Sequence, residues 1–366
     1  MYTYRKNGFF FISLILLLFF FSASAFAAPY SRFYTGVRPL GMGGAFTAVA
    51  DDQNTIFYNP AGLSRINGLT IGLLNPAVGI GENGLDMIQD IDDTNMDDTG
   101  EVTELLRKYT GKHIHLHGSL TPHIGFRIKN FGAMVSAFAI ANMDSQVRNP
   151  VYPEFHMDAH VDIGGIGGVG VMVPGGNNLR AGLSYKAISR ESLREVYTPA
   201  QIAADNFDDI LEDDRKSGSG SSFDLGLIYT LPWEKYFQTD IALVAQNLPS
   251  IEFDEGEKLE TEWIAGVAIQ KKLGPFALLA ALDYRDFTKN IKTDNDIGKR
   301  LHMGAEIKFK ELVSLRGGFN QGYPTLGAGL DLWILKFDAV MYSEEVGAYA
   351  GQREDKRYMG QLTIGW

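Results

Sequence analysis

The chain has 366 residues, of which 45% are hydrophobic and 12% aromatic, and its formal net charge is -11. This negative charge disfavours nucleic acid as a partner, and the absence of Cys excludes thiolate metal sites, Cys nucleophiles and a Cys-linked lipid anchor. After residue 27, no apolar run approaches the roughly 20 residues that a membrane-spanning helix needs. The chain is therefore either soluble or a membrane β-barrel, whose alternating strands leave a weak hydropathy signal.

Residues 1–27 are predicted to be a signal peptide. Arg5 and Lys6 give it a basic start, residues 9–21 form an almost unbroken apolar run, and Ala-Phe-Ala at 25–27 is a small-x-small cleavage site. The alternative is an uncleaved N-terminal anchor, which the short run and the Ala motif disfavour. We therefore expect export through the periplasm after signal cleavage.

Residues 28–67 do not alternate between apolar and polar side chains, and they are rich in Gly. Glycine permits tight packing and positive φ, and the Asn-Pro dipeptide is typical of a turn. A compact segment of this size before the first strand is predicted to be a plug inside a barrel. Its candidate functional residues are three glycines, an acidic pair and a tripeptide: Gly41, Gly43, Gly44, Asp51, Asp52, Asn59, Pro60 and Ala61.

Two other interpretations of this segment are weaker. A phosphate-binding loop is disfavoured, because no Lys follows the glycines and no buried strand precedes them. The acidic pair Asp51-Asp52 has the oxygens for Ca²⁺, but capping of a helix or turn is the favoured role.

Residues 68–366 read as segments of ~10 residues in which apolar side chains alternate with small or polar ones. At 301–309, for example, Leu301, Met303, Ile307 and Phe309 share one face. Fourteen candidate strands follow: 68–75, 113–128, 131–141, 157–173, 178–188, 221–231, 237–247, 261–272, 276–286, 300–309, 312–319, 324–333, 335–343 and 357–366.

The links between these strands alternate between short and long, and only the short link at 320–323 departs from the series. Tight turns at one end and long loops at the other are typical of outer-membrane barrels, whereas a β-sandwich does not sort its loops this way. Lipid also requires a closed sheet without edges. The predicted fold class is all-β: a transmembrane antiparallel β-barrel of about 14 strands with the plug inside.

Two long loops are expected to carry helices on the outer side of the barrel. The acidic segment 82–112 should contain a helix over 101–109, and residues 199–213 read as one amphipathic helix that begins at Pro199.

Histidines and charges are predicted to line the lumen. His113, His115 and His117 share the polar face of one strand, with His123 on the same face if the alternation persists. They are weak candidates for a Zn²⁺ or Cu²⁺ site, and polar lumen lining is the favoured reading. Mixed-sign charges should form networks that hold the plug, with an ion pathway as the alternative: Arg127, Arg180, Lys186, Asp224, Asp283, Glu306, Lys308, Arg316 and Asp331.

No enzyme or cofactor is expected. Barrel lipases carry Ser and His on their outer face, whereas the histidines here face inward. The chain also lacks a Gly-x-Ser-x-Gly elbow.

The N-terminal segment resembles the hatch of a known family, the FadL-like outer-membrane transporters for long-chain fatty acids, and in particular its PorV-like branch. Three motifs carry the resemblance: the glycine run at 40–45, Ala50-Asp51-Asp52 and Asn59-Pro60-Ala61. The resemblance is specific over about residues 36–64. It implies a 14-strand barrel with a movable hatch, and hydrophobic ligands that bind near the outer loops and leave into the lumen or sideways between strands. The ligand-binding loop residues of the well-studied transporters have no counterpart that aligns to this chain.

The expected function is uptake of fatty-acid-like or hydrocarbon-like molecules across the cell outer membrane. The alternative is a non-transporting scaffold or secretion accessory of the PorV-like type. The expected partners are outer-membrane lipid, lipopolysaccharide, a hydrophobic ligand, and the barrel-assembly machinery, which would read the aromatic C-terminal strand that ends at Trp366.

Overall fold

The computed structural model describes residues 32–175, 178–232, 237–253, 257–291, 296–347 and 349–366. The predicted signal peptide and residues 28–31 of the predicted plug lie outside these ranges. No helix in the described ranges is long and apolar enough to cross a membrane.

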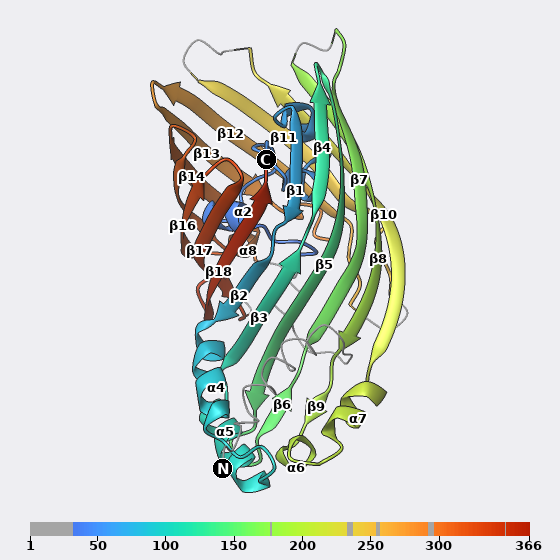
Figure 1. Cartoon of the computed structure of the whole chain (residues 1–366), viewed down its shortest axis with the longest axis vertical. Coiled ribbons are helices and arrows are strands. Elements are labelled where there is room, and N and C mark those ends of the chain that lie inside the picture. Colours follow the sequence, from blue (N-terminus) through green and yellow to red (C-terminus); the bar gives the residue numbers. More distant parts are fainter. Residues whose placement is uncertain (1–31, 176–177, 233–236, 254–256, 292–295, 348) are drawn as a thin grey trace.

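The described strands close into a single antiparallel barrel of 14 spans, as the sequence predicts (Figure 1). Strand β18 pairs with both β1 and β2 and so closes the wall. The first two spans are each built from two strands, and β6 and β9 are short additions at the rim. The strands are β1 (Leu69–Leu74), β2 (Ala77–Gly81), β3 (His113–Leu120), β4 (His123–Ile128), β5 (Phe131–Arg148), β6 (Glu154–His156), β7 (Ala159–Met172), β8 (Leu179–Leu193), β9 (Val196–Tyr197), β10 (Lys216–Thr230), β11 (Gln238–Leu248), β12 (Glu262–Leu273), β13 (Phe276–Tyr284), β14 (Leu301–Phe309), β15 (Val313–Asn320), β16 (Tyr323–Asp331), β17 (Leu335–Glu345) and β18 (Glu354–Gly365).

Short turns gather at one end of the barrel, the turn side, and long loops at the other, the loop side. The β14–β15 turn uses Lys310 and Glu311 at φ 51° and 55°. Two successive positive φ values match the twist of antiparallel strands in a two-residue turn. The short link predicted at 320–323 is also confirmed, as a tight turn at Gln321 and Gly322 with φ 53° and 92°.

The alternation predicted for the strands is confirmed, and β14 illustrates it. Met303 and Ile307 are about half exposed on the outside, whereas His302 and Glu306 are buried on the inside. Aromatic pairs lie on the outer face toward both ends, with Phe276–Phe309 at the turn side and Tyr185–Phe223 toward the loop side. An apolar exterior flanked by aromatic rings is what a lipid-facing barrel requires.

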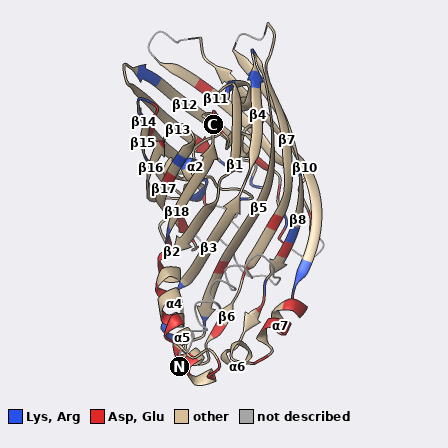
Figure 2. Cartoon of the chain, viewed as in Figure 1, with Lys and Arg blue, Asp and Glu red and all other residues tan. Residues whose placement is uncertain are grey.

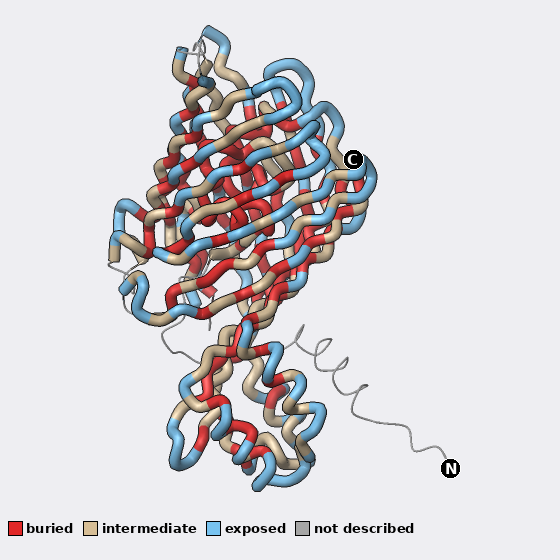
Figure 3. Tube along the Cα trace, turned by 90° about the vertical axis from the view of Figure 1, so that its left-hand side faces the viewer, coloured by how far each residue is buried: buried red, intermediate tan, exposed pale blue. Residues whose placement is uncertain are grey.

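The main hydrophobic core lies inside the barrel, around the N-terminal segment (Figure 3). This segment forms α2 (Val37–Gly41), α3 (Thr55–Tyr58) and the 3₁₀ helix η1 (Pro60–Arg65), and all three pack against inward-facing wall residues. We call residues 32–66 the hatch segment.

The wall is higher on one side, because β5 has 18 residues and β15 only 8. The high side carries a helical cap that projects beyond the barrel and has its own core (Figures 1 and 3). The cap contains α4 (Glu82–Asp92), α5 (Thr99–Lys108), α6 (Pro199–Ile202) and α7 (Phe207–Asp213), and a further short helix, α8 (Ile297–Arg300), lies just before β14.

The helix predicted over 101–109 is confirmed as α5, which Asp98 caps by accepting hydrogen bonds from the N–H groups of Gly100 and Glu101. The single helix predicted over 199–213 is wrong. Residues 203–206 separate α6 from α7, because the Thr198–Gln201 capping box closes only one short turn before the chain bends.

Leu326 offers a test of the lipid-facing surface, because its side chain is 59% exposed on the outside of β16. We expect Leu326→Arg to lower the free energy of unfolding by about 2–4 kcal/mol in phospholipid vesicles. Tyr349→Arg, at a loop residue that is 68% exposed, should change it by less than about 0.5 kcal/mol. Equal effects in denaturant titrations of the two variants would contradict the placement of Leu326 in lipid.

Candidate functional site

The tripeptide Asn59-Pro60-Ala61 is completely inside the barrel, and Asn59 is fully buried. The Asn59 side chain accepts a hydrogen bond from the Ala61 N–H and so caps η1, and its amide donates to the Thr47 carbonyl at 2.9 Å. Pro60 opens the helix, where its missing N–H costs nothing. The tripeptide therefore joins two turns of the hatch segment.

Glycines on the inner wall form a seat for this tripeptide. An added Cβ at Gly182 would lie 2.2 Å from the Ala61 nitrogen, and one at Gly226 would lie 2.0 Å from the Asn59 side-chain oxygen. At Gly132 it would lie 1.8 Å from a backbone oxygen of η1. Real Cβ atoms do not approach so closely, so the hatch backbone fits only where these strands carry no side chain. A glycine inside a strand often marks such an approach of another backbone, and this was the signal that sequence reasoning missed.

The glycine run at 40–45 has a second seat on β14, β15 and β16. Gly43 and Gly44 have φ +63° and +84°, the left-handed region expected for them. An added Cβ at Gly304 would lie 2.3 Å from the backbone oxygen of Met42. One at Gly327 would lie 3.0 Å from the Gly41 Cα. Both the glycine run and the Asn59-Pro60-Ala61 tripeptide thus rest on glycine-lined wall.

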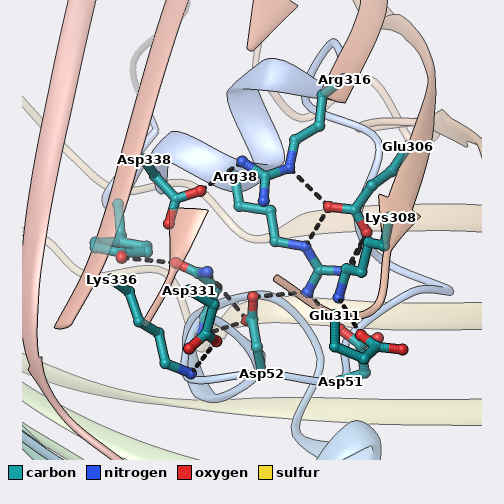
Figure 4. A network of polar contacts seen from close by, with 12 residues as sticks. Arg38, Asp51, Asp52, Glu306, Lys308, Glu311, Arg316, Asp331, Lys336 and Asp338 are labelled. Carbon is teal, nitrogen blue, oxygen red and sulfur yellow. Dashed lines mark hydrogen bonds and ion pairs between the residues drawn. The ribbon is translucent and has the colours of Figure 1, made fainter. Parts of the chain in front are cut away.

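Arg38 of α2 anchors the hatch segment to the wall through charge (Figure 4). Its guanidinium donates to both Glu306 oxygens at 2.9 and 2.8 Å, and to Asp51 and Asp52 at 2.6 and 2.7 Å. Arg316 pairs with the same Glu306 at 2.6 Å. Three carboxylates and two guanidinium groups therefore lie in one network that spans the hatch segment and β14–β15.

Asp52 has the turn-capping role that the sequence favoured for the acidic pair, whereas the ion pairs of Asp51 and Asp52 with Arg38 were not predicted. The Asp52 carboxylate accepts a hydrogen bond from the Asn54 N–H at 2.8 Å. Burial alone would raise the pKa of Asp52, but the Arg38 guanidinium outweighs it and holds that pKa below its usual value. Asp52 therefore stays ionised.

A cavity of about 860 Å³ lies on the turn side of the hatch segment. Its lining includes Arg38, Asp51, Asp52, Glu306 and Arg316, together with charged residues near the turns of β12–β17. We call it the charged chamber. Positive and negative side chains are interspersed around it.

The opposite side of the hatch segment is aromatic. Tyr34 stacks on Phe57 at 4.1 Å between ring centroids, and Phe33 meets the wall residue Phe138 edge-on at 5.1 Å. Apolar side chains from the loop after β11, among them Phe253, complete this aromatic cluster. The hatch segment thus separates this aromatic cluster on the loop side from the charged chamber on the turn side. Two paired cations border the cluster, with Lys186 5.5 Å from the Phe33 ring and Arg190 4.4 Å from the Phe253 ring.

The barrel wall is interrupted next to the hatch segment. Asn75-Pro76 breaks the first span and Thr121-Pro122 breaks the second. The Asn75 amide donates to the Thr121 carbonyl at 2.9 Å and to its hydroxyl at 2.7 Å, and the Thr121 N–H donates back at 2.8 Å. Side-chain bonds thus replace ladder bonds that the two prolines cannot donate. The continuous strand predicted over 113–128 is therefore wrong.

The wall break contacts the hatch segment through Tyr34. The Tyr34 hydroxyl donates to the Asn54 side chain at 2.8 Å and lies close to the Thr121 side chain. Asn54 in turn donates to Asp52, which pairs with Arg38. One chain of polar contacts therefore runs from the Glu306 network across the lumen to the wall break.

The three histidine candidates lie on β3, and His115 and His117 tie that strand to β5. His115 contacts Asp144 at 2.9 Å, and His117 contacts Asn142 at 2.6 Å. In the described ranges, no group of three His, Asp or Glu side chains is arranged to hold a metal ion. Of the predicted lumen charges, Asp283 also holds the hatch segment, by accepting the N–H groups of Phe46 and Thr47 at 2.8 Å each. Arg127 is exposed instead.

No protein-family model and no curated protein matches the sequence of the chain. Solved structures match its fold. The monoaromatic hydrocarbon channel CymD has a TM-score of 0.52 at 12% identity, over 90% of this chain and 96% of that one. The toluene transporter TbuX of Ralstonia pickettii has a TM-score of 0.51 at 10% identity, over 90% and 97%. These similarities confirm the 14-strand barrel fold that the hatch motif implied.

A glycine of the first seat offers a test of how the hatch segment is held. We expect Gly182→Ala to lower the free energy of unfolding by about 1–3 kcal/mol, because its Cβ overlaps the Ala61 backbone. Hatch residues should also become accessible to added protease while the barrel stays closed. In Gly167→Ala, the new Cβ meets only Val135 at 3.6 Å, so neither readout should change. Similar losses in both variants would refute the seat.

A double-mutant cycle tests the charged anchor. The Glu306 side chain is 1% exposed, so Arg38→Met removes a partner from a buried carboxylate and should be strongly destabilising. Combined with Glu306→Gln, it should cost less than the sum of the two single changes, with a coupling energy of at least about 1 kcal/mol. Denaturant unfolding measures all four proteins. Additive losses would mean that Arg38 and Glu306 do not interact.

Proposed function

We propose that the chain is an outer-membrane channel for the uptake of hydrophobic small molecules, in which residues 28–67 act as the hatch. The observation that carries this proposal is the placement of the hatch segment. It lies between the aromatic cluster and the charged chamber, at the level where two neighbouring spans are interrupted.

The two sides of the hatch segment favour a sideways exit. A hydrophobic molecule gains free energy by displacing water from the aromatic cluster. It would lose that gain in the charged chamber, where its presence would strip water from buried charges. The route of lowest cost for such a molecule is through the wall break between Asn75-Pro76 and Thr121-Pro122, into the membrane.

Tyr34 links ligand entry to this exit. A ligand that enters beside Phe57 must displace the Tyr34 ring, which stacks on it. Tyr34 then loses its contacts with Asn54 and Thr121, and the wall break loses a support from inside. Asn59-Pro60-Ala61, held on its glycine seat, is the fixed end of the hatch in this mechanism.

The fold neighbours support the ligand class. CymD is described as a monoaromatic hydrocarbon channel and TbuX as a toluene transporter. The stacked rings of the aromatic cluster here suit a planar aromatic ligand or an alkyl chain. We therefore assign small aromatic hydrocarbons and fatty acids as the ligand classes to test.

The second candidate function is a non-transporting scaffold. It is favoured by the hairpin after β11, where Ile251 and Leu259 form an isolated bridge and pack into the aromatic cluster. A hairpin that permanently fills this space would leave no room for a ligand.

A reversible lock on the wall break tests the channel. The chain has no Cys, so Asn75→Cys with Thr121→Cys introduces a single disulfide. In liposomes, we expect the oxidised protein to take up labelled toluene and long-chain fatty acid at least tenfold more slowly than the reduced protein.

The matched control joins Ala280→Cys to Ala305→Cys, which are paired residues in the uninterrupted wall, and its uptake should not depend on oxidation. If uptake is saturable and equally fast in the oxidised and reduced protein, the sideways exit is contradicted but the channel is not. Absence of uptake by a barrel with the normal heat-modifiable gel shift would contradict the channel and favour the scaffold. Replacement of Asn59-Pro60-Ala61 should reduce uptake by releasing the fixed end.

A further inference from the structure

The strand β10 has an edge without a described partner, on the loop side of the barrel. Its neighbour β8 pairs with it along its whole length, from Lys216 to Tyr229. Its other neighbour, β11, begins to pair only at Phe223. Over Ser217–Ser221, no strand or backbone hydrogen bond reaches the β11 side of β10 in the ranges that the structure describes. Figure 1 shows β10 continuing beyond the barrel toward α7.

This edge lies beyond the apolar belt. The outward residues of β10 change from Tyr229, Leu227, Leu225 and Phe223, all more than a third exposed, to serines at 217, 219 and 221. The Tyr185–Phe223 ring pair marks the transition. The five residues of the edge span about 17 Å, so a short extended segment in solution can reach all of them.

Another strand edge at the rim, on β3, is covered by a helix. On the other flank of the same tall sheet, β3 extends past its neighbour β2, and α4 covers that edge. The Asn83 side chain donates to the His113 carbonyl at 3.0 Å, and Gly84 lies against the His115 carbonyl. Proteins cover or block sheet edges because an unpaired edge recruits other strands. On β10 the edge carries Ser and Gly, with no proline, and the hairpin after β11 meets it from the lumen side, where Ile251 lies against Gly220.

We propose that the edge of β10 over Ser217–Ser221 is a docking site for an extended, basic segment of another polypeptide, which adds to the sheet as a further strand. Backbone hydrogen bonds supply the binding energy in this mode of recognition, and side chains supply the selectivity. This site acts independently of uptake, because it lies outside the lumen.

Charge sets the kind of partner. Helix α7 ends two residues before β10 and carries four exposed acidic residues and no basic one: Asp208, Asp209, Glu212 and Asp213. Glu252, on the hairpin beside the edge, has a side chain that is 76% exposed but pairs with Lys258 at 2.8 Å, so the acidic charge near the edge comes mainly from α7. Figure 2 shows acidic residues along the helices of the cap, α7 among them. A bound strand with Lys or Arg side chains meets this surface with complementary charge.

A second copy of the chain does not fit the edge. Two barrels in one membrane, related by a two-fold axis along its normal, would bring the same residues of β10 face to face and in parallel. A parallel ladder needs its two strands offset by one residue, which this symmetry forbids. Two acidic α7 helices would also repel each other.

Paired cysteine variants test the site in the full-length protein in lipid nanodiscs. Ser219 and Ser189 are exposed, directly opposed residues of β10 and β8. A strand added to β10 would lie about 4.8 Å from β10 and about 10 Å from β8. Because a disulfide needs Cα atoms within about 7 Å, only Ser219→Cys can be cross-linked to a cysteine in that strand.

The probe is a nonapeptide of alternating threonine and lysine with a central cysteine. We expect it to form a disulfide with Ser219→Cys at least tenfold faster than with Ser189→Cys. A peptide with proline in place of each threonine lacks the N–H donors at those positions and cannot pair as a continuous strand, so it should lose that advantage. Equal rates for the two variants, equal rates for the proline peptide, or peptide-independent dimers of Ser219→Cys that exclude the probe would each overturn the proposal.

A second pair of peptides tests whether the site prefers a basic partner. With Ser219→Cys, a peptide with glutamate in place of lysine should react at least fivefold more slowly than the basic peptide. Adding Asp208→Asn and Asp209→Asn should reduce this preference without changing the ratio between Ser219→Cys and Ser189→Cys for the basic peptide. A preference for the acidic peptide would overturn the assignment of a basic partner.

Discussion

The structure depends on how closely two polypeptide backbones can approach inside a closed wall. A segment in the lumen can rest its own backbone on a strand only where that strand carries no side chain, and this chain meets the condition with glycines on several strands. Gly182 and Gly226 receive Asn59 and Ala61, and Gly304 receives the turn before Gly43. The helices of the hatch segment are too short to be stable alone. Their position is therefore set by the wall.

Ion pairs between Arg38 and its carboxylate partners then hold the hatch segment in the position that the glycine seats allow. Arg38 would be costly to bury without partners, and its carboxylate partners come both from the hatch segment and from β14. A displaced hatch segment would leave Glu306 short of one cation in a place that water hardly reaches. The polar chain through Asp52, Asn54 and Tyr34 extends this dependence to the wall break. The charged chamber and the aromatic cluster thus differ in chemistry but share one set of contacts.

The sequence predicted the barrel well, because period-two alternation and turn residues are local signals. Met303 and Ile307 alternate with lumen residues wherever the strand is placed, and Lys310-Glu311 forms a turn with its immediate neighbours. The wall break was missed because Pro76 and Pro122 gain their meaning only once register sets their strands side by side. The ion pair between Arg38 and Glu306 joins residues 268 positions apart, and no pattern in one sequence records such a pair. The interruption between α6 and α7 was hidden by apolar residues that suit two short helices as well as one.

The position of the hatch segment in the chain determines the order in which the barrel can be assembled. This segment precedes β1, yet it contacts β7, β8 and β10 at one seat and β15 and β16 at another. Once β18 has paired with β1 and β2, the wall is continuous around this segment. The hatch segment can therefore reach its seats from the side only while the sheet is still open. Placed there first, the hatch segment would give the last strands a surface to close against, and the glycines that seat it in the finished protein would be part of that contact.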